Sequence, residues 1–482
     1  MTLPTSLRID ELHSTYAETD TTPVEVMRAV HDRARADETN AWITLRERSA
    51  LEERVHAVAG MDRAEAPLYG VPFAVKDNVD VAGLPTTAAC PAYEYTAEAS
   101  ATVVERLQAA GAVLVGKTNM DQFATGLVGT RSPYGDCHNP HDPAYISGGS
   151  SSGSGAAVAD GQVSFALGTD TAGSGRVPAA LTGIVGLKPT RGTVSTAEVV
   201  PACETLDCVA TFAPSVPDAV RVTRVMAGHD PADPTMRTDG LADPTVFDPP
   251  AVEAGTVGVV PAAAREFFGD DAAAAAYEDA LSTLADLGWE VEPVAFEPFR
   301  ETAELLYEGP WVAERLTVVE ELLADDPEAL LPVIREIIER GADYDATDVF
   351  EAQYDLAALR QRAREALADV DLLVTPTTGT VYTREAVAEA PVETNATLGY
   401  YTNYVNLLDM AALAVPTGLQ DDGIPFGVTL TAEAGTDGLL AAVGHDLHRA
   451  AGLSLGATDE TTAALEPLER AATERTAPPD AE

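Results

Sequence analysis

Lysine is almost absent from this chain of 482 residues. Only three of its 30 basic residues are lysine, Lys76, Lys117 and Lys188, and the rest are arginine. All three lie in the part of the chain where glycine, serine and threonine concentrate in short motifs. Because lysine is retained only in this part of the chain, we expect the functional residues to lie there. Lys76 is interpreted as a functional residue, and we expect Lys117 and Lys188 to form structural ion pairs.

Cysteine and long hydrophobic runs are also scarce. The four cysteines are scattered and none forms a CxxC pair, so we expect free thiols and no disulfide framework. No run approaches the roughly 20 apolar residues of a membrane-spanning helix. Residues 1–11 carry charges with no apolar stretch behind them, which predicts no signal peptide and a cytoplasmic location.

Positive charge is the third deficiency. Against 30 Lys and Arg stand 77 Asp and Glu, a formal net charge of −47 that is spread along the whole length. Such a surface would repel phosphates, which argues against binding to nucleic acid. It resembles the surfaces of proteins from high-salt cytoplasm, where molar salt shortens the Debye length to about 3 Å and screens self-repulsion. We therefore expect a halophilic protein with an acidic surface.

Helical and strand patterns alternate along the chain, which predicts an α/β fold with a largely internal sheet. Thr22–Glu25 forms a capping box for a first helix, and residues 71–75 form a buried strand that ends at Lys76. Ser100 is expected to cap a helix that stops at Gly111. Further elements are expected as a strand over 112–115, helices over 272–287 and 356–367, and strands over 289–294 and 372–375.

The 46% of hydrophobic residues is enough for a large core, and one domain is predicted over residues 1–456. Beyond it, residues 457–482 are acidic and rich in Ala and Thr, which predicts a flexible tail. The expected parts of the domain are an N-terminal helical segment over about 1–60, a core over about 65–215, and a helical segment over about 297–368, with helices at 301–323 and 327–340, that covers the site.

Two segments rich in glycine and serine stand out, Gly148–Gly155 and Gly168–Arg176. Glycine lets the backbone turn tightly and approach a ligand closely, and serines placed there can act as nucleophiles or offer N–H groups to an anion. A flexible linker is disfavoured because an apolar run, 177–187, follows at once. The GxxxxGK[ST] pattern of a phosphate-binding loop is absent.

A GxSxG pattern at residues 149–153 would make Ser151 the nucleophile of an α/β-hydrolase. Such a hydrolase needs a downstream histidine, for which His229, His445 and His448 are the candidates. No recognisable motif surrounds any of these histidines, so this alternative rests on a short, low-complexity match.

Three separated motifs resemble the amidase signature family. Lys76 lies in VKDN, Ser150 opens the GGSS run, and Ser174 closes GTDTAGS 24 positions later, as in that family. The resemblance implies a Ser–cisSer–Lys triad in which Ser174 is the nucleophile and Ser150, after a cis peptide bond, relays its proton to Lys76. Lysine acts as a base only when neutral, so burial beside apolar side chains has to lower its pKa from about 10.4.

The same resemblance implies the amidase signature fold, a central mixed, twisted β-sheet covered by helices on both faces, with no cofactor and no metal. Backbone N–H groups would form the oxyanion hole, where loss of one donor typically costs about 10²–10³-fold in rate. The residues expected to supply them are Thr171, Ala172, Gly173 and Ser174. Asp170 and Arg176 flank this turn and are expected to hold it in place.

Within the family the chain is most similar to allophanate hydrolases, through Pro67–Asn78, Ala82–Pro91, Asn119–Gly135 and Gly168–Cys208. The resemblance implies hydrolysis of allophanate to ammonia and a carboxylated carbamate that loses carbon dioxide. Tyr307 and Arg315 fall where similar enzymes hold the substrate carboxylate, which suits the planar fork of arginine.

The resemblance also implies a homodimer, a small-molecule amide substrate, and a functional link to a biotin-dependent urea carboxylase that supplies allophanate. Longer relatives carry a further C-terminal domain for the later decarboxylation, which is not expected in this chain.

Three alternatives stay open. The chain could be the amidase subunit of a glutamyl-tRNA amidotransferase, although GTDTAGS stands where that protein usually has GSDTGGS. It could be a generalist amidase for small amides. It could also be a catalytically silent binding protein on the same scaffold, which the intact Ser174, Ser150 and Lys76 argue against.

Overall fold

The computed structural model describes residues 6–468 and contains, within them, one mixed sheet of 11 strands. In sheet order the strands are β1 (Trp42–Leu45), β5 (Val113–Thr118), β2 (Pro72–Lys76), β6 (Phe165–Asp170), β8 (Cys208–Ala213), β7 (Val185–Lys188), β12 (Met410–Leu419), β13 (Pro425–Glu433), β11 (Leu372–Pro376), β9 (Thr256–Val259) and β10 (Glu290–Pro293). A separate pair consists of β3 (Pro85–Thr86) and β4 (Tyr95–Thr96).

Both parallel and antiparallel pairs occur in the large sheet. The neighbours β5, β2 and β6 run parallel, as do β11, β9 and β10. Between these two groups, β6, β8, β7, β12, β13 and β11 pair antiparallel in turn. The predicted mixed sheet is therefore confirmed.

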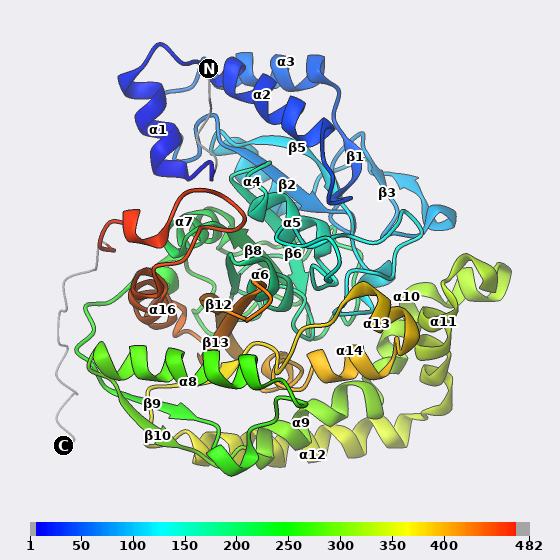
Figure 1. Cartoon of the computed structure of the whole chain (residues 1–482). Helices are drawn as coiled ribbons and strands as arrows, with labels where there is room; N and C mark the ends of the chain where they lie inside the picture. Colours follow the sequence, from blue (N-terminus) through cyan, green and yellow to red (C-terminus); the bar gives the residue numbers. More distant parts are fainter. Residues whose placement is uncertain (1–5, 469–482) are drawn as a thin grey trace, which may run out of the picture.

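Helices surround this sheet (Figure 1). They are α1 (Ile9–Glu18), α2 (Pro23–Arg35), α3 (Arg48–Val58), α4 (Thr102–Ala109), α5 (Ser152–Ala159), α6 (Val177–Thr182), α7 (Val216–Met226), α8 (Asp271–Asp286), α9 (Glu297–Glu308), α10 (Trp311–Asp325), α11 (Pro332–Glu339), α12 (Ala346–Ala366), α13 (Arg384–Glu389), α14 (Glu393–Leu398), α15 (Tyr404–Leu407) and α16 (Asp437–Ala451).

The central strands bury side chains on both faces because helices cover both. Phe73 and Val75 of β2 belong to an apolar cluster with α4, α7, α8 and α16. Ala74, between them, belongs to a second cluster with α2, α3, α5 and α6. This alternation is the two-residue period of a strand. It confirms the predicted α/β architecture with helices on both faces.

Most expected elements form, with local differences. The capping box at Thr22 begins α2 as predicted, with Glu25 N–H donating to the Thr22 hydroxyl. The expectation that Ser100 caps the next helix is wrong. Ala101 occupies the cap of α4, and the Ser100 hydroxyl accepts the N–H of Ala82 instead. The hydroxyl therefore joins two loops and does not start a helix.

The helical segment near residues 297–368 also differs in detail. The single helix expected over 301–323 is two helices, α9 and α10, which end and begin on either side of Gly309 and Pro310. Proline lacks the N–H that would continue the hydrogen-bond ladder, so α10 starts afresh there.

The predicted flexible tail is wrong for its first residues. Leu455 N–H donates to the Glu460 carbonyl, and a 3₁₀ turn, η7 (Thr462–Ala464), follows. The Glu460 carboxylate accepts the Ser6 N–H at 3.1 Å, so the two ends of the described chain are joined. Leu465 is buried against this packing. The rest of the predicted tail, 469–482, lies outside the described residues.

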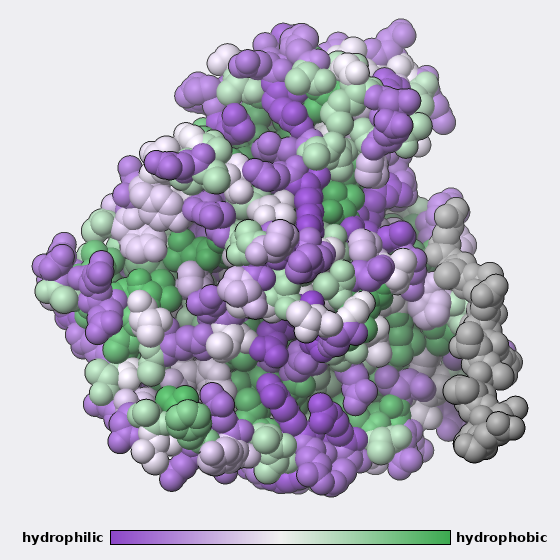
Figure 2. Space-filling model, turned by 180° about the vertical axis from the view of Figure 1, so that it is seen from behind, coloured by the Kyte–Doolittle hydropathy of each residue, from purple (hydrophilic) through white to green (hydrophobic). Residues whose placement is uncertain are grey.

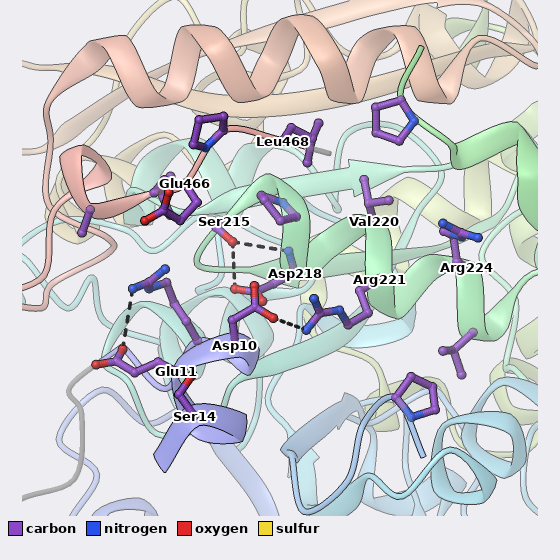
Figure 3. Close-up of a pocket in the computed structure, with 18 of the residues that line it drawn as sticks. Asp10, Glu11, Ser14, Ser215, Asp218, Val220, Arg221, Arg224, Glu466 and Leu468 are labelled. Carbon is purple, nitrogen blue, oxygen red and sulfur yellow. Dashed lines mark hydrogen bonds and ion pairs between the residues drawn. The ribbon is translucent and has the colours of Figure 1, made fainter. Parts of the chain in front are cut away.

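Beside these joined ends, α1, α7 and residues 464–468 enclose a hollow of about 990 Å³ (Figure 3). The close-up shows Asp10 reaching Arg221, and Ser215 capping α7 through Asp218. None of the predicted site residues lines this hollow. On the face seen in Figure 2, hydrophilic residues dominate and hydrophobic ones form small scattered groups. Among the described residues, no helix is long and apolar enough to cross a membrane.

Candidate active site

The three predicted triad residues come from the parallel part of the sheet. Lys76 is the last residue of β2, and Ser174 follows the end of the neighbouring parallel strand β6. Ser150 lies just before α5. Because the carboxyl ends of parallel strands share one edge of a sheet, this topology brings Lys76 and Ser174 together, and the loop before α5 places Ser150 between them.

The three side chains form one chain of hydrogen bonds. Lys76 Nζ donates to Ser150 Oγ at 2.8 Å, and Ser150 Oγ donates to Ser174 Oγ at 2.9 Å. The Gly149–Ser150 peptide bond is cis, as the resemblance implied. All three side chains are buried. When the Lys76 amine is neutral, the two hydroxyl groups can turn round and donate in the opposite direction, and a proton can then pass from Ser174 through Ser150 to Lys76 along the same contacts.

Burial prepares Lys76 to accept that proton. Burial lowers the pKa of Lys76 to about 7, although the carboxylates of Asp121, Asp207 and Asp170 act in the opposite direction. Lys76 Nζ also donates to Thr169 Oγ1 at 2.8 Å, a contact that no sequence pattern indicated. When the amine is neutral, this second contact leaves its lone pair free for the Ser150 hydroxyl. The Thr169 hydroxyl thus orients the amine.

The loop after β6 is held by a buried ion pair. The Asp170 carboxylate accepts bonds from Gly173 N–H, Gly175 N–H and the Arg176 guanidinium, all at 2.9–3.0 Å. Asp170 and Arg176 have no exposed side-chain surface, and Arg176 lowers the pKa of Asp170 against the effect of burial. The predicted structural role of this pair is consistent with these contacts.

The same contacts revise the predicted oxyanion hole. Gly173 N–H already donates to Asp170, so it differs from the other three expected donors. Within residues 6–468, the N–H groups of Thr171, Ala172 and Ser174 make no hydrogen bond. Gly173 adopts φ +137°, and a Cβ there would lie 2.5 Å from Thr402 Oγ1. Only glycine fits this position of the turn. The N–H groups of Thr171, Ala172 and Ser174 are free to donate to an anion.

Asp207 was not predicted as a site residue, yet it braces the loop from the other side. The Thr171 hydroxyl and the backbone N–H groups of Ala202 and Cys203 all donate to its carboxylate. Burial raises the pKa of Asp207 to about 6. The residue stands one position before the end of the Gly168–Cys208 stretch, but only its three-dimensional contacts reveal the role.

Tyr307 and Arg315 come together across the break between α9 and α10. The Arg315 guanidinium lies 5.3 Å from the centroid of the Tyr307 ring, and Nη2 donates to the Tyr307 hydroxyl at 3.4 Å. Nη1 donates to Thr125 Oγ1 at 3.1 Å. Arg315 Nε is buried and has no hydrogen-bond partner among the described residues. A buried arginine with a free donor is suited to an anionic ligand.

Arg315 also belongs to the same electrostatic environment as the serine–lysine chain. Its positive charge is near enough to lower the pKa of Lys76 and of Asp207. No carboxylate lies within ion-pairing distance of Arg315 in the described part of the chain. Arg315 is therefore influenced by Asp207 at a distance but has no carboxylate in contact among these residues, which leaves its guanidinium available to an anionic ligand.

The alternative nucleophile, Ser151, has different contacts. Its hydroxyl donates to the Thr169 carbonyl at 3.2 Å and accepts the Thr169 N–H. Among the described residues, none of the three candidate histidines, His229, His445 and His448, hydrogen-bonds to the Ser151 hydroxyl. The arrangement that an α/β-hydrolase requires is not formed around Ser151.

The two other lysines have different partners. Lys117 lies 3.4 Å from the Asp77 carboxylate in a fully buried pair, so its predicted ion pair is confirmed. The ion pair expected for Lys188 is wrong: over residues 6–468 no carboxylate lies within 4.0 Å of it. Lys188 Nζ donates instead to the Pro189 carbonyl and to Cys208 Sγ. Among the same residues, no group of three His, Cys, Asp or Glu could hold a metal ion.

Similarity to known proteins agrees with this geometry. The family model Amidase matches residues 25–441. The chain belongs to the amidase family. This amidase is 33% identical to a glutamyl-tRNA(Gln) amidotransferase subunit of Gloeobacter violaceus, over 90% of this chain and 94% of that protein. Family membership makes it an amidohydrolase.

Two further relatives are more similar. Saccharomyces cerevisiae urea amidolyase is 46% identical over 401 residues, which cover 83% of this chain but 22% of that protein. The chain thus spans about a fifth of that relative's length. The structure of Kluyveromyces lactis allophanate hydrolase superimposes with a TM-score of 0.86 at 40% identity, covering 92% of this amidase and 72% of that chain.

Proposed function

We propose that this amidase hydrolyses allophanate with Ser174 as nucleophile, Ser150 as proton relay and Lys76 as base. The observation that carries the proposal is the unbroken hydrogen-bond chain Lys76–Ser150–Ser174 beside a buried arginine that lacks a counter-ion. Identity of 40% to an allophanate hydrolase and 46% to a urea amidolyase supports the choice of substrate.

The first half of the reaction forms an acyl-enzyme. Ser174 Oγ attacks the terminal amide carbon while its proton passes to Ser150 and the Ser150 proton passes to Lys76. The carbonyl oxygen becomes an oxyanion, which the free N–H groups of Thr171, Ala172 and Ser174 stabilise. The C–N bond then breaks, the relay returns a proton to the leaving nitrogen, and ammonia departs.

The second half returns the enzyme to its starting state. Water attacks the acyl carbon and gives a proton to the same relay, which returns it to Ser174 Oγ as the bond between that oxygen and the acyl carbon breaks. The released product is a carboxylated carbamate, which loses carbon dioxide in a later step. No cofactor is needed for this sequence, because every proton is carried by Ser150 and Lys76.

Recognition of the substrate depends on its carboxylate. We assign this contact to Arg315, through its free Nε and its terminal nitrogens, with the Tyr307 hydroxyl as a second donor. A small neutral amide such as acetamide lacks that carboxylate and would leave Arg315 buried without a counter-charge. The cost of that state favours the anion over neutral amides.

Other properties follow from the sequence and the relatives. The net charge of −47 suits a cytoplasm of high salt, and the match to urea amidolyase supports a functional link to a urea carboxylase that supplies the substrate. We further propose a homodimer. Tm measured in 0.1 and 2 M KCl tests the preference for high salt, and a lower Tm at 2 M would contradict it. Light scattering at the higher salt tests the homodimer, and a monomer would contradict it.

A substrate panel tests the function. Ammonia release is measured from allophanate, biuret, acetamide and glutamine, with wild type and two variants. Arg315→Gln should raise KM for allophanate strongly, whereas Arg335→Gln, which removes a half-buried arginine of α11 that pairs with Glu328, should leave it unchanged. Faster ammonia release from biuret, acetamide or glutamine than from allophanate would contradict the proposal that allophanate is the substrate.

Glutamine hydrolysis is the second candidate, because the amidotransferase protein matches over 94% of its length. Silence on all four substrates in the folded protein, followed by glutaminase activity with a partner chain, would favour it. Activity on allophanate without a partner would exclude it as the main function.

A further inference from the structure

A hollow of about 180 Å³ lies where α12 passes the turn between α15 and β12. Its charged lining consists of Arg237, Arg360, Arg364, Asp409 and Glu433. Three positive groups therefore meet two negative ones, although the whole chain has 77 acidic and 30 basic residues. The local balance is opposite to that of the molecule.

The two carboxylates do not neutralise all three arginines. Arg237 donates to Asp409 at 2.9 Å and to Asp239 at 2.6 Å, so its guanidinium is fully engaged. Asp409 is also shared with Arg191, whose Nε lies 3.5 Å away. Glu433 forms no ion pair within 4.0 Å in the described chain.

Arg360 and Arg364 are left with a net positive charge. They lie four residues apart on α12 and therefore on one face of the helix, where like charges repel. Arg360 Nε donates to the Leu407 carbonyl at 2.9 Å. Over the described residues, the terminal nitrogens of Arg360 and the whole guanidinium of Arg364 have no hydrogen bond or ion pair.

The surroundings of Arg360 are electropositive as well. Burial lowers the pKa of Arg360, the charges of Arg191 and Arg364 lower it further, and only Asp409 raises it. The hollow of Figure 3 is different, because its arginines Arg8 and Arg221 each form an ion pair with a carboxylate of the chain. In the hollow beside α12, Arg237 is paired in this way, but among the described residues Arg360 and Arg364 form no ion pair.

We propose that this hollow is a binding site for a small oxyanion of the phosphate or bicarbonate kind, held by the guanidinium groups of Arg360 and Arg364. The planar fork of a guanidinium matches two oxygens of such an anion, and the terminal nitrogens of Arg360 are free to donate to it. The ligand relieves the repulsion between the two arginines. No substrate group is required, so the site is independent of the proposed hydrolysis of allophanate.

An occupied site would also stabilise the support of the active-site loop. Arg360 contacts Leu407, and the adjacent Asn406 donates through Nδ2 to the carbonyls of Asp170 and Leu206 at 2.7 and 2.9 Å. The anion thus fixes α12 against the segment that holds the Asp170 turn. We expect the bound anion to raise the thermal stability of the whole domain.

The test is a titration of the full chain with potassium phosphate at constant ionic strength and pH, with Tm as the readout. Wild type should show a Tm that is flat well below the Kd for phosphate and rises with the logarithm of the phosphate concentration above it. Arg364→Gln and Arg360→Gln should each weaken the apparent affinity for phosphate by about tenfold or more, which corresponds to about 1.4 kcal/mol. Arg362→Gln is the matched control, because it removes an arginine of the same helix that pairs with Glu301.

Parallel titrations with bicarbonate and chloride identify the ligand. The oxyanion that binds more tightly is the ligand, and chloride should give no rise that depends on Arg360 and Arg364. A rise that is equal in all four proteins would be a general effect of salt on the surface and would overturn the site. Absence of any rise in wild type, or equal affinity in wild type and Arg364→Gln, would overturn it too.

Discussion

Protonation of Lys76 should set the lower limit of the pH range in which this amidase works. A lysine with the reference pKa of about 10.4 would be neutral in only about 0.04% of molecules at pH 7. Burial lowers the pKa of Lys76 to about 7, so that about half of the molecules carry the neutral base at that pH. Because the protonated form cannot accept the relayed proton, kcat/KM should fall about tenfold for each pH unit below this value.

The assay is the initial rate of ammonia release from allophanate between about pH 5.5 and 9. Tm is recorded at each pH, so that unfolding is not mistaken for titration. Arg315→Gln provides an internal check of the assignment. The positive charge of Arg315 lowers the pKa of Lys76, so its removal should move the midpoint of the profile to higher pH, in addition to raising KM.

A profile without a break in this range would refute the role of Lys76 as the base. A rate that still rises about tenfold per pH unit up to pH 9 would mean that burial does not shift the pKa of the lysine, and the proton would then need another acceptor at neutral pH. A midpoint that moves to lower pH in Arg315→Gln would contradict the electrostatic argument, because removal of a positive neighbour cannot stabilise the neutral amine.

Three further substitutions test the remaining parts of the site. Arg315→Gln removes charge-assisted hydrogen bonds to the substrate carboxylate and should raise KM about 100-fold, with a smaller change in kcat, in steady-state assays with allophanate. Gly173→Ala places a Cβ 2.5 Å from Thr402 Oγ1 and should lower kcat by about 10²–10³-fold through displacement of the oxyanion loop, with kcat at saturating substrate as the measurement. Arg176→Met leaves Asp170 buried without its partner and should lower the free energy of unfolding by about 3–5 kcal/mol in urea titration.

The sequence predicted the parts of the fold that depend on local patterns. The strand that ends at Lys76 and the capping box at Thr22 are both present, because a buried apolar run and a cap are local properties. Ser100 failed as a cap because its hydroxyl is used by a loop distant in the chain, at Ala82. The packing of residues 457–468 was missed for a similar reason, since their partners include Ser6 at the opposite end.

The residues of the site also fall into two groups, those that a sequence motif indicates and those that only their contacts reveal. The resemblance of three motifs to the amidase signature family implied that Lys76, Ser150 and Ser174 act together, and the structure joins them by two hydrogen bonds. Asp207 and Thr169 could not be found from spacing, because a carboxylate and a hydroxyl gain their roles only from what they contact. Lys188 shows the reverse error. The scarcity of lysine suggested an ion pair, but Lys188 Nζ donates to a backbone carbonyl and to a cysteine sulfur instead of a carboxylate.

The central claim is that Ser174, and not Ser151 of the other glycine-rich segment, is the nucleophile. Ammonia release from allophanate is therefore compared for wild type, Ser174→Ala and Ser151→Ala, each with its Tm as a control for folding. We expect Ser174→Ala to fall to the uncatalysed background with Tm unchanged, and Ser151→Ala to retain measurable turnover. Turnover that persists in Ser174→Ala, or is lost only in Ser151→Ala, would contradict the proposed mechanism.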